Sequence, residues 1–143
     1  MASVSVSASL PTEPGKTWDA LADLPHWEDW LSIHQAWKGE LPTDVAVGAR
    51  MTEVVSVMGM ANKIDWTVTE LDAPHMVKIA GAGMAGVTIE FTLSVQAEGT
   101  GSQATIDASF TGAMIVGPIG KAVAKNAKGD LEKSLAKFAE LHS

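Results

Sequence analysis

Residues Gly117–Leu141, GPIGKAVAKNAKGDLEKSLAKFAEL, form the longest stretch of helical periodicity in the sequence. Apolar side chains recur there at spacings of three and four, which places them on one stripe of a helix, while the lysines mostly lie off that stripe. Pro118 suits the first helical position and Gly117 suits the N-cap. Gly129 either marks a bend or is a tolerated surface glycine. The segment predicts one long helix with a buried face and a solvated face.

Upstream of this helix the pattern is that of strands. Val87–Val95 alternates apolar and polar residues without a break, and Ala104–Phe110 repeats the alternation after a GTGS turn. Such alternation is typical of strands that bury one face and expose the other. The same alternation appears, less cleanly, in four further segments: Val4–Leu10, Ala49–Val57, Ile64–Val68 and Met76–Ala80.

The connections are also marked in the sequence. PTEPGKTWDALADL and PHWEDWL predict two short helices broken at Pro25, and Ser32–Thr43 predicts a loop that crosses back over the fold. In GMAN, Gly59 and Asn62 suit a hairpin turn. The segment GAGMAG, Gly81–Gly86, joins two strands, so it predicts either a flap or a loose hairpin rather than a phosphate-binding loop.

The order of these elements predicts an α+β fold with an antiparallel sheet of about six strands. Strands and helices are segregated along the chain, and a length of 143 residues suits a single domain over residues 1–143. Each predicted strand has one apolar face, and only the last helix is long enough to cover it. A strongly curved sheet around a single helix leaves space between the two, so we expect a cavity there.

Composition excludes several classes of function. The chain has no cysteine, which excludes disulfides, thiolate catalysis and Cys-ligated metals. A net charge of −7 disfavours nucleic-acid binding, and the lysines of the last helix are better explained as a solvated face. No apolar stretch is long enough to span a membrane, and no secretory signal is present, so we expect a cytoplasmic protein. No pair of histidines has metal-ligand spacing, and no cofactor is predicted.

The chain resembles the SRPBCC superfamily of START domains, Bet v 1-like proteins and polyketide aromatase/cyclases. The resemblance is carried by the element order, by PxxxWDALADL after the first strand, by VGARMTEVVSVMGMANKIDWTVTELDAP and by MIVGPIGKAVAKNAKGDLEKSLAKF. LPHWEDWLSIHQAWKGELP with GMANKIDWTV is similar to an actinobacterial subgroup classed as polyketide cyclase/dehydrase-like, some of whose members are described as type II toxins. The resemblance implies a helix-grip fold that binds a hydrophobic small molecule, a lipid or an aromatic polyketide, and for the toxin-like members an antitoxin protein as partner.

The inward strand positions and the helix stripe supply the candidate ligand-binding residues, which either line a pocket or fill a core. Small or flexible helix residues opposite the sheet leave space for a ligand. The predicted ligand-binding set is Trp37, Met51, Glu53, Val55, Trp66, Val68, Ile89, Phe91, Ile106, Phe110, Ala127 and Leu131.

Two residues are candidates for acid or base chemistry. The phase of its strand points Glu53 inward, where a carboxylate needs a partner, unless a bulge turns it outward. His34 lies between Trp30 and Trp37, and an imidazole suits proton transfer near neutral pH. Arg50 has the opposite strand phase and is predicted at the surface or at the cavity mouth.

Three hypotheses of function remain open at this point. The first is a carrier of a lipid or polyketide-like molecule, and the second is a cyclase/dehydrase-type enzyme that uses Glu53 or His34. Aromatase/cyclases often use tyrosine or arginine, whereas this chain has no tyrosine and a single arginine. The third is a toxin that acts through a protein contact made by the tryptophan-rich segment Trp27–Trp37.

Overall fold

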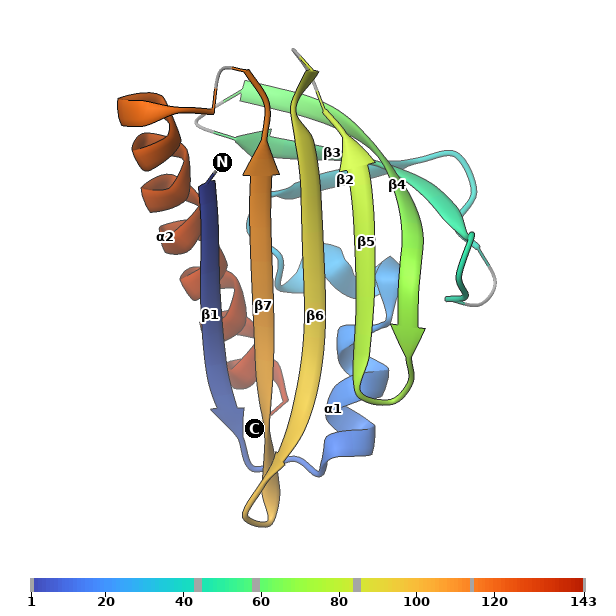
Figure 1. The fold of residues 1–143 in the computed structure, drawn as a ribbon. Helices are drawn as coiled ribbons and strands as arrows, with labels where there is room; N and C mark the ends of the chain where they lie inside the picture. Colours follow the sequence, from blue (N-terminus) through green and yellow to red (C-terminus); the bar gives the residue numbers. More distant parts are fainter. Residues whose placement is uncertain (1, 43–44, 58–59, 84–85, 114, 143) are drawn as a thin grey trace.

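The structure, a computed structural model, describes residues 2–42, 45–57, 60–83, 86–113 and 115–142. Seven strands form one sheet, and every neighbouring pair in it is antiparallel. Figure 1 shows a strongly curved sheet with the helices on one side of it, which confirms the predicted α+β helix-grip architecture. The elements are β1 (Ala2–Leu10), α1 (Pro14–Leu21), the 3-10 helix η1 (Leu24–Asp29), β2 (His34–Lys38), β3 (Arg50–Val57), β4 (Met60–Asp72), β5 (Met76–Ala82), β6 (Thr88–Glu98), β7 (Gly101–Thr111) and α2 (Gly117–Leu141).

The sheet has the order β1-β7-β6-β5-β4-β3-β2. Its inner face carries the apolar positions of the alternating segments, for example Ile89, Phe91 and Leu93 of β6, which are all buried. Their polar neighbours along the strand are half-buried or exposed. The period-two pattern therefore places the core on the face that the helices cover.

The edge strand β2 is a correction to the sequence prediction, which made Ser32–Thr43 a loop. His34–Lys38 pairs antiparallel with β3, and the register shifts between His34 and Ala36. That irregularity breaks the alternation of side chains, so five residues around a bulge carry no period-two signal. The sheet consequently has seven strands instead of about six.

Helix α2 is divided by burial into two halves. Figure 1 shows it running beside β1, behind the strands. In its C-terminal half Leu131, Leu135 and Phe138 are almost completely buried, whereas Val123, Ala124 and Ala127 of the N-terminal half are only partly buried. The cap residue is Val116 instead of Gly117, whose φ of +55° is a conformation that favours glycine.

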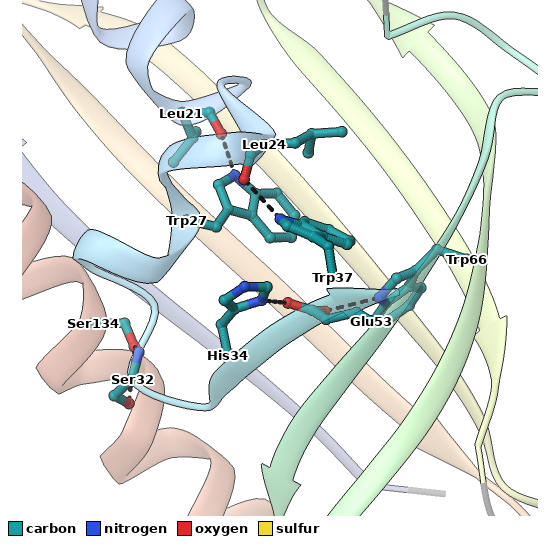
Figure 2. Close-up of polar contacts among 9 residues, drawn as sticks. All are labelled: Leu21, Leu24, Trp27, Ser32, His34, Trp37, Glu53, Trp66 and Ser134. Atoms are coloured by element: carbon teal, nitrogen blue, oxygen red, sulfur yellow. Dashed lines mark hydrogen bonds and ion pairs between the residues drawn. The ribbon is translucent and has the colours of Figure 1, made fainter. Parts of the chain in front are cut away.

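The two short helices after β1 are present, although shorter than predicted. Trp27 Nε1–H donates to the carbonyl oxygen of Leu21 at 3.0 Å, and Trp37 Nε1–H donates to that of Leu24 at 2.9 Å. Figure 2 shows both bonds, which tie η1 to α1 and to β2. The two indole hydrogen bonds therefore position the start of β2 relative to α1 and η1.

Two predicted turns are only partly described. Asn62 lies in β4 paired with Val55, so the β3–β4 connection is shorter than GMAN, and Gly59 falls outside the described residues. In the segment Gly81–Gly86, Gly81 and Ala82 belong to β5, and residues 84–85 fall outside the description. A Cβ on Gly81 would lie 2.7 to 2.9 Å from atoms of β4, so only glycine lets the two strands pack this closely.

Candidate functional site

An apolar cavity lies between the inner face of the sheet and the N-terminal half of α2. Its volume is about 20 Å³, which is room for about one water molecule. The side chains that line it come from β3, β4, β6, β7, α2 and the residue before β2. They are Ile33, Val55, Ser56, Ile64, Ile89, Phe91, Phe110, Val123, Asn126, Ala127, Asp130 and Leu131.

A second apolar space of about 100 Å³ adjoins the first. Ile89, Phe110 and Val123 line both spaces, so the two spaces share part of their wall. The second space is also lined by residues in or next to the ends of β4, β5 and β6 and before α2: Asn62, Gly83, Val87 and Ile115. Together the two spaces follow the loosely packed half of α2.

The surface of the first cavity is almost entirely apolar, although three polar residues contribute atoms to its lining. Ser56 lies on β3, while Asn126 and Asp130 lie one turn apart on α2. Asn126 Nδ2–H donates to Asp130 Oδ2 at 3.2 Å, and the backbone N–H of Ser56 donates to Ile33 O at 2.7 Å. Such a site, mostly apolar with a few polar groups, is typical of small-molecule pockets.

Hydrogen bonds of Ser32 and Ser134 hold α2 at the edge of this cavity where Asp130 lies. The backbone N–H of Ser32 donates to Ser134 Oγ at 2.9 Å, and Ser32 Oγ–H donates to the carbonyl oxygen of Asp130 at 3.1 Å. Ser134 Oγ also lies 2.8 Å from that carbonyl oxygen. Figure 2 shows Ser32 and Ser134 side by side between η1 and α2. These bonds tie the turn of helix at Asp130 to the residues that precede β2.

Glu53 is completely buried and accepts two hydrogen bonds, which confirms its predicted inward phase. Trp66 Nε1–H donates to Glu53 Oε1 at 2.9 Å, and His34 Nδ1–H donates to Glu53 Oε2. The side chain of His34 is 2% exposed, and its ring packs on Trp37 with a centroid separation of 5.0 Å. Both carboxylate oxygens are therefore matched with an N–H donor, as a buried acid requires.

This network can orient an imidazole. A carboxylate that accepts from Nδ1 fixes the ring position and leaves Nε2 as the atom that exchanges protons, as in a hydrolase triad. Neither His34 nor Glu53 lines the apolar cavity, because Val55 occupies the next inward position of β3 toward it. The structure thus brings the two predicted acid–base candidates to each other, beside the cavity wall.

Half of the predicted ligand-binding set lines the cavity, and the contact of these residues with a ligand stays a prediction. Trp37, Met51, Glu53, Trp66, Val68 and Ile106 point inward or lie in the core without lining it. The residues at the cavity are Val55, Ile89, Phe91, Phe110, Ala127 and Leu131.

The predicted ligand-binding set lacks six residues that also line the cavity: Ile33, Ser56, Ile64, Val123, Asn126 and Asp130. On α2 a signal was available, because Val123, Asn126 and Asp130 recur at spacings of three and four along the border of the apolar stripe. The border residues on both sides of a stripe look alike in sequence, so the pattern does not say which side faces the sheet.

Two other expectations can be compared with the structure. Trp27 and Trp30 are 1% and 4% exposed, so a protein that contacts the segment Trp27–Trp37 would meet side chains other than these two indoles. Arg50 is exposed, as its strand phase predicts. Among the described residues there is no cluster of His, Asp and Glu that could hold a metal ion, and no helix there is both long enough and apolar enough to cross a membrane.

Comparison with known proteins assigns this chain to a family. A family model described as polyketide cyclase/dehydrase and lipid transport matches residues 1–142. Protein Rv1546 of Mycobacterium tuberculosis (strain ATCC 25618 / H37Rv) is 41% identical over 142 residues, covering 99% of each chain. The protein named Toxin Rv0910, from the same strain, is 33% identical over 138 residues, covering 96% of each chain.

A solved structure shares the fold at low sequence identity. The protein TTHA0849 from Thermus thermophilus superposes with a TM-score of 0.78 at 19% identity, and the match covers 96% of this chain and 94% of that one. The resemblance noted from the sequence is confirmed by the family match and by this fold. Over residues 1–142, the chain belongs to the polyketide cyclase/dehydrase and lipid transport family.

Proposed function

We propose that the protein binds an apolar or amphipathic small molecule between the inner face of the sheet and the N-terminal half of α2. The observation that carries the proposal is the pair of adjoining apolar spaces under the part of the helix that packs least tightly. The lipid-transport description of the family supports the same reading.

Binding must widen the site. Spaces of about 20 Å³ and 100 Å³ are well below the roughly 300 Å³ that small-molecule pockets usually reach. Outward displacement of the N-terminal half of α2 would join the two spaces, because Val123 lines both of them. The exposed fractions of Val116, 58%, and Ile119, 52%, indicate that this end of the helix gains little from packing where it stands.

A blocking variant on α2 tests the proposal. Ala127→Phe puts an aromatic ring into the cavity, whereas Ala122→Phe puts the same ring on the exposed side of the same helix. We expect the apolar fluorophore N-phenyl-1-naphthylamine to bind the wild type and A122F equally, and A127F at least about tenfold more weakly, a loss of about 1.4 kcal/mol. Failure of the wild type to bind the probe, or equal binding by the two variants, would contradict the proposal.

The His34–Glu53–Trp66 network supports a second candidate function, proton transfer during a cyclase/dehydrase-type reaction. Glu53 would hold the ring while His34 Nε2 exchanges a proton with a substrate that has entered the widened cavity. The test is turnover of a poly-β-ketone thioester by the wild type, His34→Gln and Glu53→Gln. Turnover that survives both replacements would remove this assignment.

The relative named Toxin Rv0910 raises growth inhibition as a further use of this chain, with an antitoxin protein as partner. A partner would contact surface other than the indoles of Trp27 and Trp30, because both are buried. Induced expression in a mycobacterial host tests this use, and unchanged growth would count against it.

A further inference from the structure

The start of α2 exposes apolar side chains to solvent. All four residues of the segment 116–119, VGPI, are exposed, and Val116 and Ile119 keep more than half of their surface accessible. Leu141, the other strongly exposed apolar side chain of the helix, lies at its opposite end. We call residues 116–119 the apolar tip. Two large apolar side chains this exposed and this close together indicate a surface that another apolar phase covers.

Three lysines follow the apolar tip on one side of the helix. Lys121, Lys125 and Lys128 are exposed, and at 3.6 residues per turn they lie within about 60° of one another. Among the described residues, no carboxylate lies within ion-pair distance of any of the three. Side chains of a helix lean toward its N-terminus, so these ammonium groups lean toward the apolar tip.

Negative charge is missing from this part of the sequence. Residues 108–129 contain the three lysines and no Asp or Glu, in a chain whose net charge is −7. Strand β1, which runs beside α2 in Figure 1, has no charged side chain. A helix is stabilised by carboxylates in its first turn, yet α2 has none there, and its first charged residue is Lys121. Helix stability therefore does not explain the distribution of charge.

The opposite charge gathers elsewhere in the molecule. Residues 13–29, which include α1 and η1, hold five carboxylates and one lysine. Figure 1 shows α1 toward the other end of the strands from the start of α2. A protein with its charges separated in this way is oriented by the field of an anionic surface, so that the start of α2 approaches first.

We propose that the apolar tip and the three lysines dock the protein on the surface of an anionic lipid bilayer. Val116 and Ile119 enter the interfacial region while the lysines lie near the lipid phosphates, a combination typical of peripheral membrane binding. At a rise of 1.5 Å per residue, Lys121 and Lys125 lie about 3 Å and about 9 Å along the helix from Ile119. Both distances are close to or below the Debye length at physiological salt, about 8 Å.

Docking at the apolar tip brings lipid next to the loosely packed half of α2. Ile115 directly precedes the tip and lines the second apolar space. An apolar molecule that leaves the bilayer there has a short path to that space. The docking itself requires no bound ligand, so it goes beyond the small-molecule proposal and is tested separately from it.

Flotation with lipid vesicles tests the docking. We expect the protein to bind vesicles of equal parts phosphatidylglycerol and phosphatidylcholine at least about tenfold more tightly than vesicles of phosphatidylcholine alone, and high salt should weaken this binding. Lys121→Gln combined with Lys125→Gln should weaken it about tenfold or more, since each lysine near an anionic surface contributes about fivefold. The control, Lys133→Gln combined with Lys137→Gln, removes the same charge from exposed positions beyond Asp130 and should change binding by less than about twofold.

The apolar tip is tested with a matched pair of residues from the two ends of α2. Ile119→Ser should weaken vesicle binding at least about fivefold, whereas Leu141→Ser should leave it unchanged. Because the chain has no cysteine, Ile119→Cys and Leu141→Cys each provide a single site for the environment-sensitive fluorophore NBD. We expect anionic vesicles to shift the NBD emission to shorter wavelength in the labelled Ile119→Cys protein only.

Several results would overturn the docking proposal. These are failure of the wild type to bind the anionic vesicles, an equal loss of binding in the two lysine pairs, and an emission shift in the labelled Leu141→Cys protein instead of Ile119→Cys. Binding of duplex DNA as tight as that of the vesicles, with both unaffected by Ile119→Ser, would also overturn it and show a general polyanion surface. Binding of N-phenyl-1-naphthylamine without vesicles is a separate measurement, and its failure contradicts only the small-molecule proposal.

Discussion

The interface between sheet and helices has two ends that differ in packing. At the packed end, which comprises Leu131–Phe138 of α2 with Trp27 and Trp30, the side chains that face the sheet are almost completely buried. Trp30 and Phe138 meet there edge to face with centroids 5.1 Å apart. At the hollow end, which comprises residues 117–127 of α2 with the cavity wall, helix side chains are half-buried or exposed and two apolar spaces remain.

The difference shows that one helix can both stabilise the domain and border a space for a ligand. Core packing and the serine contacts at Asp130 anchor the packed end, so the hollow end can move without unfolding the domain. The sheet has the same division, because Val55 and Ser56 of β3 line the cavity while Glu53 is hydrogen-bonded beside it. Stability is concentrated at one end, and the proposed binding site lies at the other.

The largest expected effect compares one apolar residue from each end. Phe138→Ala removes a completely buried ring from the packed end and should lower the free energy of unfolding by about 3–5 kcal/mol. Val123→Ala at the hollow end should lower it by less than about 1 kcal/mol, because the side chain is only partly buried. Urea unfolding measures both values, and similar losses would mean that the two ends are packed alike.

The next effect concerns the buried network beside the cavity. Glu53→Leu leaves the N–H groups of Trp66 and His34 without an acceptor and should cost about 2–4 kcal/mol of unfolding free energy. Glu53→Gln keeps one carbonyl acceptor and should cost less, about 1–2 kcal/mol. Chemical denaturation distinguishes the two variants. A stable Glu53→Leu protein would show that the network does not stabilise the wall.

A smaller effect tests the anchor between the two ends. Ser134→Ala removes the acceptor of the Ser32 N–H and should cost about 1–2 kcal/mol of unfolding free energy. It should also speed the release of N-phenyl-1-naphthylamine in stopped-flow measurements, because the helix is less firmly held at Asp130. Unchanged stability together with unchanged release would show that this contact is not an anchor.

The smallest effect has the opposite sign. A Cβ on Gly129 would meet no atom within 4 Å, so Gly129→Ala fits and should raise the free energy of unfolding by about 0.5–1 kcal/mol through helix propensity. Because Gly129 precedes Asp130, a stiffer helix should also slow entry of the probe into the hollow end. Thermal unfolding and association kinetics measure the two effects. A loss of stability would show that this position needs the freedom of glycine.

Much of the packed architecture could be predicted from the sequence. The unbroken alternation of Val87–Val95 predicts a strand with one buried face, and the same logic correctly places Glu53 inward. Strand β2 could not be predicted, because a register shift between His34 and Ala36 removes the two-residue period.

The hollow end was harder to predict for a different reason. Curvature around a single helix predicts a space, but its size depends on how side chains such as Phe110 and Val123 are packed, which no pattern specifies. The apolar stripe of α2 identifies Ala127 and Leu131, whereas Asn126 and Asp130 lie on its border. Their position at the cavity depends on how the helix is rotated over the sheet, which is a tertiary property.

Backbone hydrogen exchange along α2, measured by NMR with and without N-phenyl-1-naphthylamine, tests the central claim most directly. We expect amides of residues 121–128 to exchange at least about tenfold faster than those of residues 131–138, and the probe to slow the first group selectively. Uniform protection along the helix, with no change when the probe is added, would contradict the account.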